Sequence, residues 1–216
     1  PSEIEYVACA LPDWEGAFNT SLRFKNWSFS MQWDGKVGGM TYSQSHHKMC
    51  EQGHLAETLN GRKPGTSLYL DIADPDVLKL FEKQKITPVA GVYCIAPGVV
   101  DNGDGTYSPN QKLVTLESYY KEYYRIGNVE TNTFSTTYLK LREVRLDYQL
   151  PKSWLKNTFI NNASVGIYGR NLLCITSYPM YDPETTSLDG NTFVPGVEVG
   201  TLPTSRSWGV NLKVDF

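Results

Sequence analysis

The final segment of the chain, from Arg206 to Phe216, alternates strictly between apolar and polar side chains. A β-strand has a period of two residues, so this segment places every apolar side chain on one face. One apolar and one charged polar face are typical of a transmembrane β-strand. The sequence also stops on an aromatic residue, which favours a barrel closed by its last strand over a soluble sandwich. The expected membrane-facing residues are Trp208, Val210, Leu212, Val214 and Phe216.

The composition fits this interpretation and excludes two other classes of protein. The 216 residues include 14 Tyr, 8 Phe, 5 Trp and 18 Gly, but no apolar run approaches the roughly 20 residues that a membrane helix needs. A mean hydropathy of -0.37 is compatible with barrel strands, because lipid-facing and lumen-facing residues alternate along them. The net charge of -3 provides no basic surface, so nucleic acid is not an expected partner.

Two further regions show the strand period. Residues 18–24 and 27–33 alternate around Lys25-Asn26, which predicts a hairpin with a two-residue turn. Residues 138–151 also alternate, but Leu139 and Leu141 have the opposite parity to Val144 and Leu146. We therefore expect a β-bulge near Arg142, a contact with a plug, or an extension beyond the bilayer.

The other elements are shorter or less regular. Residues 34–65 predict a long polar loop, and the Asp-Pro-Asp run at Asp74 predicts the cap of a short helix. The tip at 101–107 is rich in Gly, Asp and Asn and predicts a tight turn, with Lys112 at the twelfth position arguing against a calcium loop. Further expectations are strands at 89–95 and 163–168, the latter ending at 169–172, and a loop over 177–203.

Four stretches, taken in order, resemble a known family. They are Tyr138-Leu-Lys-Leu-Arg-Glu-Val-Arg-Leu-Asp-Tyr-Gln-Leu-Pro151, Gly169-Arg-Asn-Leu-Leu173, Tyr181-Asp-Pro-Glu184 and Pro203-Thr-Ser-Arg-Ser-Trp-Gly-Val-Asn-Leu212. Upstream, Asp34-Gly-Lys-Val-Gly-Gly39 and Gly61-Arg62 fit the same pattern. In order and spacing, the series resembles the C-terminal region of the SusC/RagA-type TonB-dependent transporters. No single stretch is decisive, and the likeness is strongest over residues 138–216.

The resemblance implies an all-β fold, an antiparallel transmembrane β-barrel of roughly 22 strands with long extracellular loops and an N-terminal plug. It also implies residence in the bacterial outer membrane, a SusD-like surface lipoprotein as partner, and TonB as the source of energy. Residues 1–216 would form a C-terminal segment of that barrel, with roughly seven to nine strands. The start at Pro1, which lacks a signal peptide, is interpreted as a mature start or as the beginning of a piece. Such a segment must pair with the remaining strands of the same transporter, because open sheet edges are unstable in lipid.

The expected function is active import of a nutrient, most simply an oligosaccharide, with a peptide as the alternative. Tyr119, Tyr120, Tyr123 and Tyr124 are weak candidates for sugar binding, because aromatic rings stack on sugar faces, and they equally suit an interfacial girdle. Asp182-Pro183-Glu184 is explained by turn chemistry. No catalytic motif is present, so the chain is not expected to be an enzyme or to need a cofactor.

A group of metal-binding residue types is also present. His46, Cys50 and His54 would share one helical face, with His47 beside them. Without a helix cap or an obvious supporting carboxylate, the sequence favours a polar extracellular loop, and no metal is assigned. The four cysteines form no CxxC pair and are interpreted as free thiols.

Two other classes of function remain open at this point. A soluble all-β module that binds carbohydrate would bury the same apolar faces in a protein interior. A complete small barrel, acting as an adhesin or a structural protein, would need no further strands. Exposed apolar faces would favour the transporter or the small barrel, and buried apolar faces would favour the soluble module.

Overall fold

The computed structural model describes residues 6–185, 187–189 and 192–216. The chain divides into two compact units. The first, which we call the sheet unit, comprises Pro1–Ser43 and Thr133–Phe216, and the second, which we call the insert unit, comprises Gln44–Asn132. Most of the strands predicted from the sequence therefore lie in the sheet unit, and most of the predicted long loop is a structured insertion.

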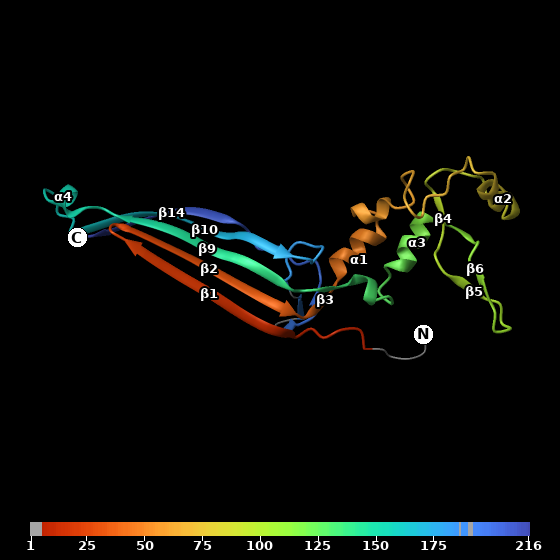
Figure 1. Cartoon of the computed structure of the whole chain (residues 1–216), viewed down its shortest axis with the longest axis horizontal. Coiled ribbons are helices and arrows are strands. Elements are labelled where there is room, and N and C mark those ends of the chain that lie inside the picture. Colours follow the sequence, from red (N-terminus) through yellow and green to blue (C-terminus); the bar gives the residue numbers. More distant parts are fainter. Residues whose placement is uncertain (1–5, 186, 190–191) are drawn as a thin grey trace. The chain divides into compact units, whose positions relative to one another are not determined.

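A five-stranded antiparallel sheet forms the main body of the sheet unit (Figure 1). Its strands follow the order β1-β2-β9-β10-β14. The predicted hairpin is confirmed, and Lys25 occupies its turn with a φ of 53°. The strand bounds are β1 Pro12–Phe24, β2 Trp27–Gly38, β9 Tyr138–Gln149, β10 Asn162–Thr176 and β14 Ser207–Asp215.

The sheet is open at β1 and β14, since neither pairs a second time in the part of the chain that the structure describes. The expected seven to nine barrel strands are more than the described residues form, since five long strands make up this sheet. Three strands extend further than predicted, and β1 begins at Pro12 rather than at residue 18. β2 continues to Gly38, and β10 continues through the Gly169–Leu172 stretch where an end was expected.

The predicted bulge in β9 is confirmed. Gln32 pairs with Glu143 and Trp33 pairs with Leu141, which leaves Arg142 as an extra residue opposite β2. β10 is irregular at the same level, where Asn171 has a φ of 52°. The extra residue brings the two halves of β9 back into phase, so their apolar side chains share one face.

Short and long connections leave opposite ends of the sheet. The β1–β2 turn and the β9–β10 connection, which carries helix α4 (Lys152–Leu155), lie at one end (Figure 1). The β2–β9 and β10–β14 connections leave from the other end. Near that end lie the smaller strands β3 Met40–Ser43, β8 Thr133–Ser135, β11 Ser187–Asp189, β12 Thr192–Val194 and β13 Val197–Glu198.

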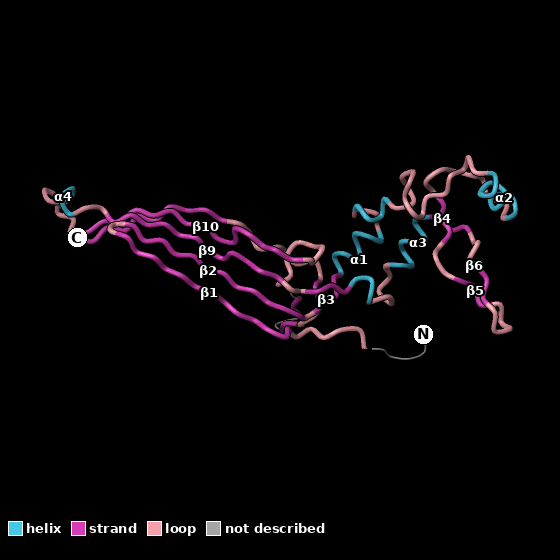
Figure 2. Tube along the Cα trace, in the orientation of Figure 1, coloured by secondary structure: helices cyan, strands magenta, loops and turns pink. Residues whose placement is uncertain are grey.

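The insert unit contains helices and short hairpins (Figure 2). Asp74 caps α2 by accepting a hydrogen bond from the backbone N–H of Asp76, as the sequence predicted. The expected loop around His46 is wrong, because residues 44–51 form a helix. The elements are α1 Gln44–Glu51, η1 Ala56–Leu59, α2 Pro75–Lys83, β4 Tyr93–Ile95, β5 Val99–Asp101, β6 Tyr107–Pro109, β7 Leu113–Thr115, α3 Leu116–Tyr123 and η2 Glu130–Asn132.

Two other predictions for the insert unit have different outcomes. The turn at residues 101–107 is confirmed as the tip of the β5–β6 hairpin. The strand expected over residues 89–95 is confined to β4, because only three residues pair with β7. No helix in the described part of the chain is long and apolar enough to cross a bilayer.

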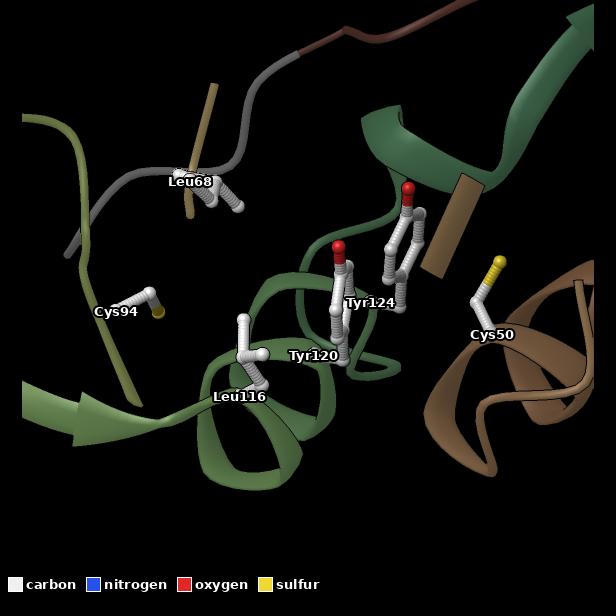
Figure 3. Close-up of a cluster of buried hydrophobic side chains, with 6 residues drawn as sticks. All are labelled: Cys50, Leu68, Cys94, Leu116, Tyr120 and Tyr124. Atoms are coloured by element: carbon white, nitrogen blue, oxygen red, sulfur yellow. The ribbon is translucent and has the colours of Figure 1, made fainter. Parts of the chain in front are cut away.

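The core of the insert unit forms between α1, α3 and the segments beside them (Figure 3). Tyr120 stacks on Tyr124, with ring centroids 6.1 Å apart, and its hydroxyl donates a hydrogen bond of 2.7 Å to the carbonyl of Asn60. Helix α1 is only eight residues long, so it depends on this tertiary packing. The buried side chains are those of Cys50, Leu68, Cys94, Leu116, Tyr120 and Tyr124.

Candidate functional site

The five-stranded sheet has one apolar face and one polar face. Its pairing places side chains from all five strands in rows that cross the sheet. One such row combines five apolar residues, and Val210 at its edge is 73% exposed. Exposure of this extent is unusual for the side of a sheet that belongs to a protein core. The row consists of Leu22, Phe29, Leu146, Ile167 and Val210.

The predicted membrane-facing residues of β14 lie on this apolar face. Trp208, Val210 and Leu212 are exposed, as is Phe216 just beyond the strand, and Val214 is half-buried. Phe216 stacks on Phe159, with ring centroids 5.6 Å apart. These side chains are exposed in this chain, and their contact with lipid stays a prediction.

Aromatic rings cover glycines on both faces of the sheet. A Cβ atom at Gly169 would lie 2.8 Å from the Trp208 ring, and one at Gly209 would lie 2.5 Å from the Tyr168 ring. These distances are too short for a side chain, so glycine is required at both positions for the ring to lie flat. Each ring thereby protects the backbone of a neighbouring strand.

The polar face carries a group of ionic side chains that we call the anchor cluster. Arg142, at the bulge, donates two hydrogen bonds of 2.7 Å to the two carboxylate oxygens of Asp34 on β2. It also pairs with Glu184, which lies in the β10–β14 connection. The cluster is Asp34, Tyr138, Lys140, Arg142, Asp182 and Glu184.

Lys140 is the buried centre of the anchor cluster. Its side chain is 4% exposed and pairs with Asp182 at 2.6 Å and also with Glu184. The Tyr138 hydroxyl donates a 2.6 Å hydrogen bond to Glu184, and Thr204 donates one to the second oxygen of Asp182. The Tyr181–Glu184 stretch is therefore attached to the sheet by charge-assisted hydrogen bonds, which are the stronger kind.

The environment of the two loop carboxylates keeps them ionised. Burial alone would raise the pKa of Asp182, but the hydrogen bonds from Lys140 and Thr204 outweigh it and lower the pKa. Burial acts in the same direction on Glu184, where hydrogen bonds from Arg142, Lys140 and Tyr138 again lower the pKa. Both carboxylates are held against the sheet as anions, so ion pairs as well as turn chemistry fix this stretch.

Helix α3 and its C-cap place the four tyrosines proposed for sugar binding in two different environments. Tyr120 and Tyr124 belong to the core of the insert unit, where burial raises the pKa of Tyr120 to about 12. Tyr123 is exposed and Tyr119 is half-buried, with their rings stacked 5.6 Å apart. The two outer rings are therefore accessible to a ligand, and a role in binding stays a prediction.

The structure brings together only two of the four residues in the predicted group of histidines and cysteine. His46 and Cys50 are buried one turn apart on α1, and both contact Glu57 of η1. His47 instead pairs with Glu51 at 3.6 Å, and His54 is exposed and lies outside this contact. Glu57 was not identified from the sequence, because it lies in a separate turn and no motif spacing links it to α1. All four cysteines are free thiols.

The comparisons with known proteins agree with the fold. No model of a known protein family matches the chain. Among curated proteins, the chain is similar to TonB-dependent receptor P3 of Formosa agariphila, with 23% identity over 212 residues. That similarity spans 95% of this chain and 16% of the relative. The chain therefore has only a small fraction of the length of the curated protein it matches.

Two solved structures have the same fold over nearly the whole chain. The RagAB peptide importer in the closed-closed state has a TM-score of 0.55 and 17% identity, over 96% of this chain and 18% of that chain. A structure of the RagAB peptide transporter has a TM-score of 0.52 and 17% identity, over 96% of this chain and 17% of that chain. Together with the curated relative, these matches confirm the resemblance to SusC/RagA-type TonB-dependent transporters that the sequence predicted.

Proposed function

We propose that this chain, which resembles the SusC/RagA-type TonB-dependent transporters, forms part of the wall of an outer-membrane β-barrel that imports nutrients. The observation that carries this proposal is the continuous exposed apolar face of the five-stranded sheet. Hydrocarbon would cover this face, and the polar face with the anchor cluster would line the lumen. The alternative of a soluble carbohydrate-binding module is disfavoured, because it would bury the apolar face.

The two open edges of the sheet support a place within a larger barrel. Unpaired backbone groups are too costly in hydrocarbon, so β1 and β14 would pair with strands of the same transporter outside this chain. Residues 1–216 would be the C-terminal segment of that barrel, which would reach roughly 22 strands when complete. A plug domain would close the lumen, and TonB would drive its rearrangement during import.

The arrangement of the connections suggests which end of the sheet faces outward. Outer-membrane barrels have short periplasmic turns and longer extracellular loops. The β1–β2 turn would accordingly lie at the periplasmic rim, and the insert unit would be part of an extracellular connection. A SusD-like surface lipoprotein would act there as partner, and nutrient would bind to loops and plug. The named relatives are a receptor and an importer, which supports a protein that is not an enzyme.

The imported nutrient would be an oligosaccharide, with a peptide as the second candidate. The exposed ring of Tyr123, which stacks on the half-buried ring of Tyr119, favours a sugar, because exposed aromatic rings pack on sugar faces. The peptide candidate is favoured by the similarity to a structure described as a peptide importer. Mass spectrometry of ligand that copurifies with the complete transporter would distinguish the two, since it would detect either glycan or peptide.

A pair of neighbouring substitutions on β14 tests the membrane assignment. Val210→Lys would place a charge in hydrocarbon, at a cost of about 2–4 kcal/mol near the bilayer centre. Asn211→Lys would place the same charge on the polar face. The abundance of folded protein in the outer membrane should fall for the first variant and stay near wild type for the second. Equal abundance of the two variants would contradict the proposal.

A further inference from the structure

Three side chains of the insert unit bring metal-binding atoms together. Cys50 Sγ lies 3.6 Å from His46 Nε2, and the Oε1 atom of Glu57 lies 2.6 Å from that nitrogen and 2.7 Å from the sulfur. All three atoms lie within 4.8 Å of one another. His46 and Cys50 are one helical turn apart on α1, and Glu57 approaches from η1.

From this geometry we propose that His46, Cys50 and Glu57 bind a zinc-type divalent cation. A thiolate, an imidazole and a carboxylate suit Zn²⁺, whereas Ca²⁺ and Mg²⁺ prefer oxygen ligands alone. The proposal does not depend on the transport function. The cation would join α1 to η1 and leave one coordination position for water.

The distances are compatible with a tetrahedral site after a small movement. Zinc bonds to nitrogen, oxygen and sulfur place neighbouring ligand atoms roughly 3.3–3.6 Å apart. The separation of sulfur and nitrogen already has this value. The Glu57 oxygen would withdraw by roughly 0.6–0.9 Å to reach the same separation. Its side chain is 45% exposed, so it is free to make this movement and also marks a route of entry from solvent.

A hydrogen bond to Asn132 fixes the orientation of the His46 ring. Asn132 is fully buried, and its side-chain N–H donates a 3.0 Å hydrogen bond to the carbonyl of Tyr124. Its Oδ1 atom lies 3.0 Å from His46 Nδ1 and so accepts the N–H of that nitrogen. Nε2 faces Glu57 and Cys50, and a divalent cation would take the place of the proton that Nε2 shares with Glu57. Ligating histidines commonly donate their other N–H in this way.

The remaining surroundings would shield the Cys50 side of the cation from bulk water. Cys50 has no exposed surface and lies beside Tyr124 in the core of the insert unit (Figure 3). Binding would displace the thiol proton of Cys50 and the proton shared by His46 and Glu57, and both protons would pass to solvent. The site differs from the one considered in the sequence, since Glu57 takes the place of His54.

Titration with cobalt provides the test, because a cobalt–thiolate bond gives a near-ultraviolet charge-transfer band. The complete transporter, without a histidine tag and with its thiols reduced, would be titrated with Co²⁺ and then with Zn²⁺. We expect a band that Zn²⁺ displaces, that Cys50→Ser abolishes and that Cys94→Ser preserves. Cys94 is the matched control, because it is an equally buried free thiol outside the three-residue group.

A variant of Glu57, the exposed ligand, provides a second test if the Cys50→Ser protein fails to assemble. Glu57→Gln removes an anionic ligand and should lower the affinity for Co²⁺ by at least about tenfold. His54→Gln should leave that affinity unchanged. The proposal is overturned by the absence of a band in the wild type, by a band that persists in Cys50→Ser, or by unchanged affinity in Glu57→Gln.

Discussion

At the scale of single residues, Lys140 is the most sensitive member of the anchor cluster. Lys140→Met would leave Asp182 buried without its cation, which typically costs about 3–5 kcal/mol. The Tyr181–Glu184 stretch should then detach from the sheet, and proteases should cleave the β10–β14 connection faster in the complete transporter. Lys121→Met is the matched control, because the pair of Lys121 with Glu117 is exposed. Equal cleavage of the two variants would show that the buried pair does not hold the connection.

The same cluster predicts how attachment of this connection depends on pH. The pKa values of Asp182 and Glu184 are lowered in the attached state, so attachment favours their ionised forms. This contribution is fully present above their ordinary pKa values of about 4 and is lost as the pH falls through the lowered values. Hydrogen exchange of residues 181–184, corrected for intrinsic pH effects, should therefore rise only under acidic conditions. Equal protection at pH values near 7 and near 2 would argue against this linkage.

Residue types at fixed spacing predicted part of these sites. His46 and Cys50 are four residues apart in the sequence, which places them on one face if the segment is helical. Glu57 and Asn132 could not be predicted, because tertiary packing alone brings them to His46. The ion pair of Lys140 with Asp182 joins residues 42 positions apart, and no local pattern encodes it.

At the scale of elements, the bulge in β9 explains a change of parity that a regular strand could not accommodate. Deletion of Arg142 would remove the extra residue and keep Leu141 and Val144 on the apolar face. Deletion of Arg145 would instead shift half of the strand by one residue and turn its apolar side chains to the polar face. We therefore expect more folded protein in the outer membrane for the Arg142 deletion. The reverse order would contradict this account of the bulge.

Strands were easier to predict than helices for a physical reason. Each long strand has one apolar face and one polar face, so apolar and polar residues alternate visibly in its sequence. Helix α1 has no such signal, because its eight residues mix good helix formers with the weaker Ser, His and Cys, and contacts with α3 and η2 support it. The short strand β4 is stabilised by tertiary contacts, namely its pairing with β7 and the burial of Cys94 in the core, so its bounds could not be predicted from local sequence.

At the scale of the whole molecule, the account depends on which medium covers the apolar face of the sheet. Single cysteines at Val210, Asn211, Leu212 and Lys213 can carry a fluorescent label in the complete transporter, after Cys9 and Cys174 are replaced by serine. These two cysteines are exposed and would otherwise react with the label. Brominated lipids in a reconstituted bilayer then quench only those labels that reach the hydrocarbon.

This quenching experiment tests the central claim most directly. The account predicts strong quenching at Val210 and Leu212 and weak quenching at Asn211 and Lys213, because these pairs lie on opposite faces of β14. Quenching that is equal at all four positions, or stronger at Asn211 and Lys213, would contradict a membrane-facing apolar surface and with it the proposed place of this chain in a transporter wall.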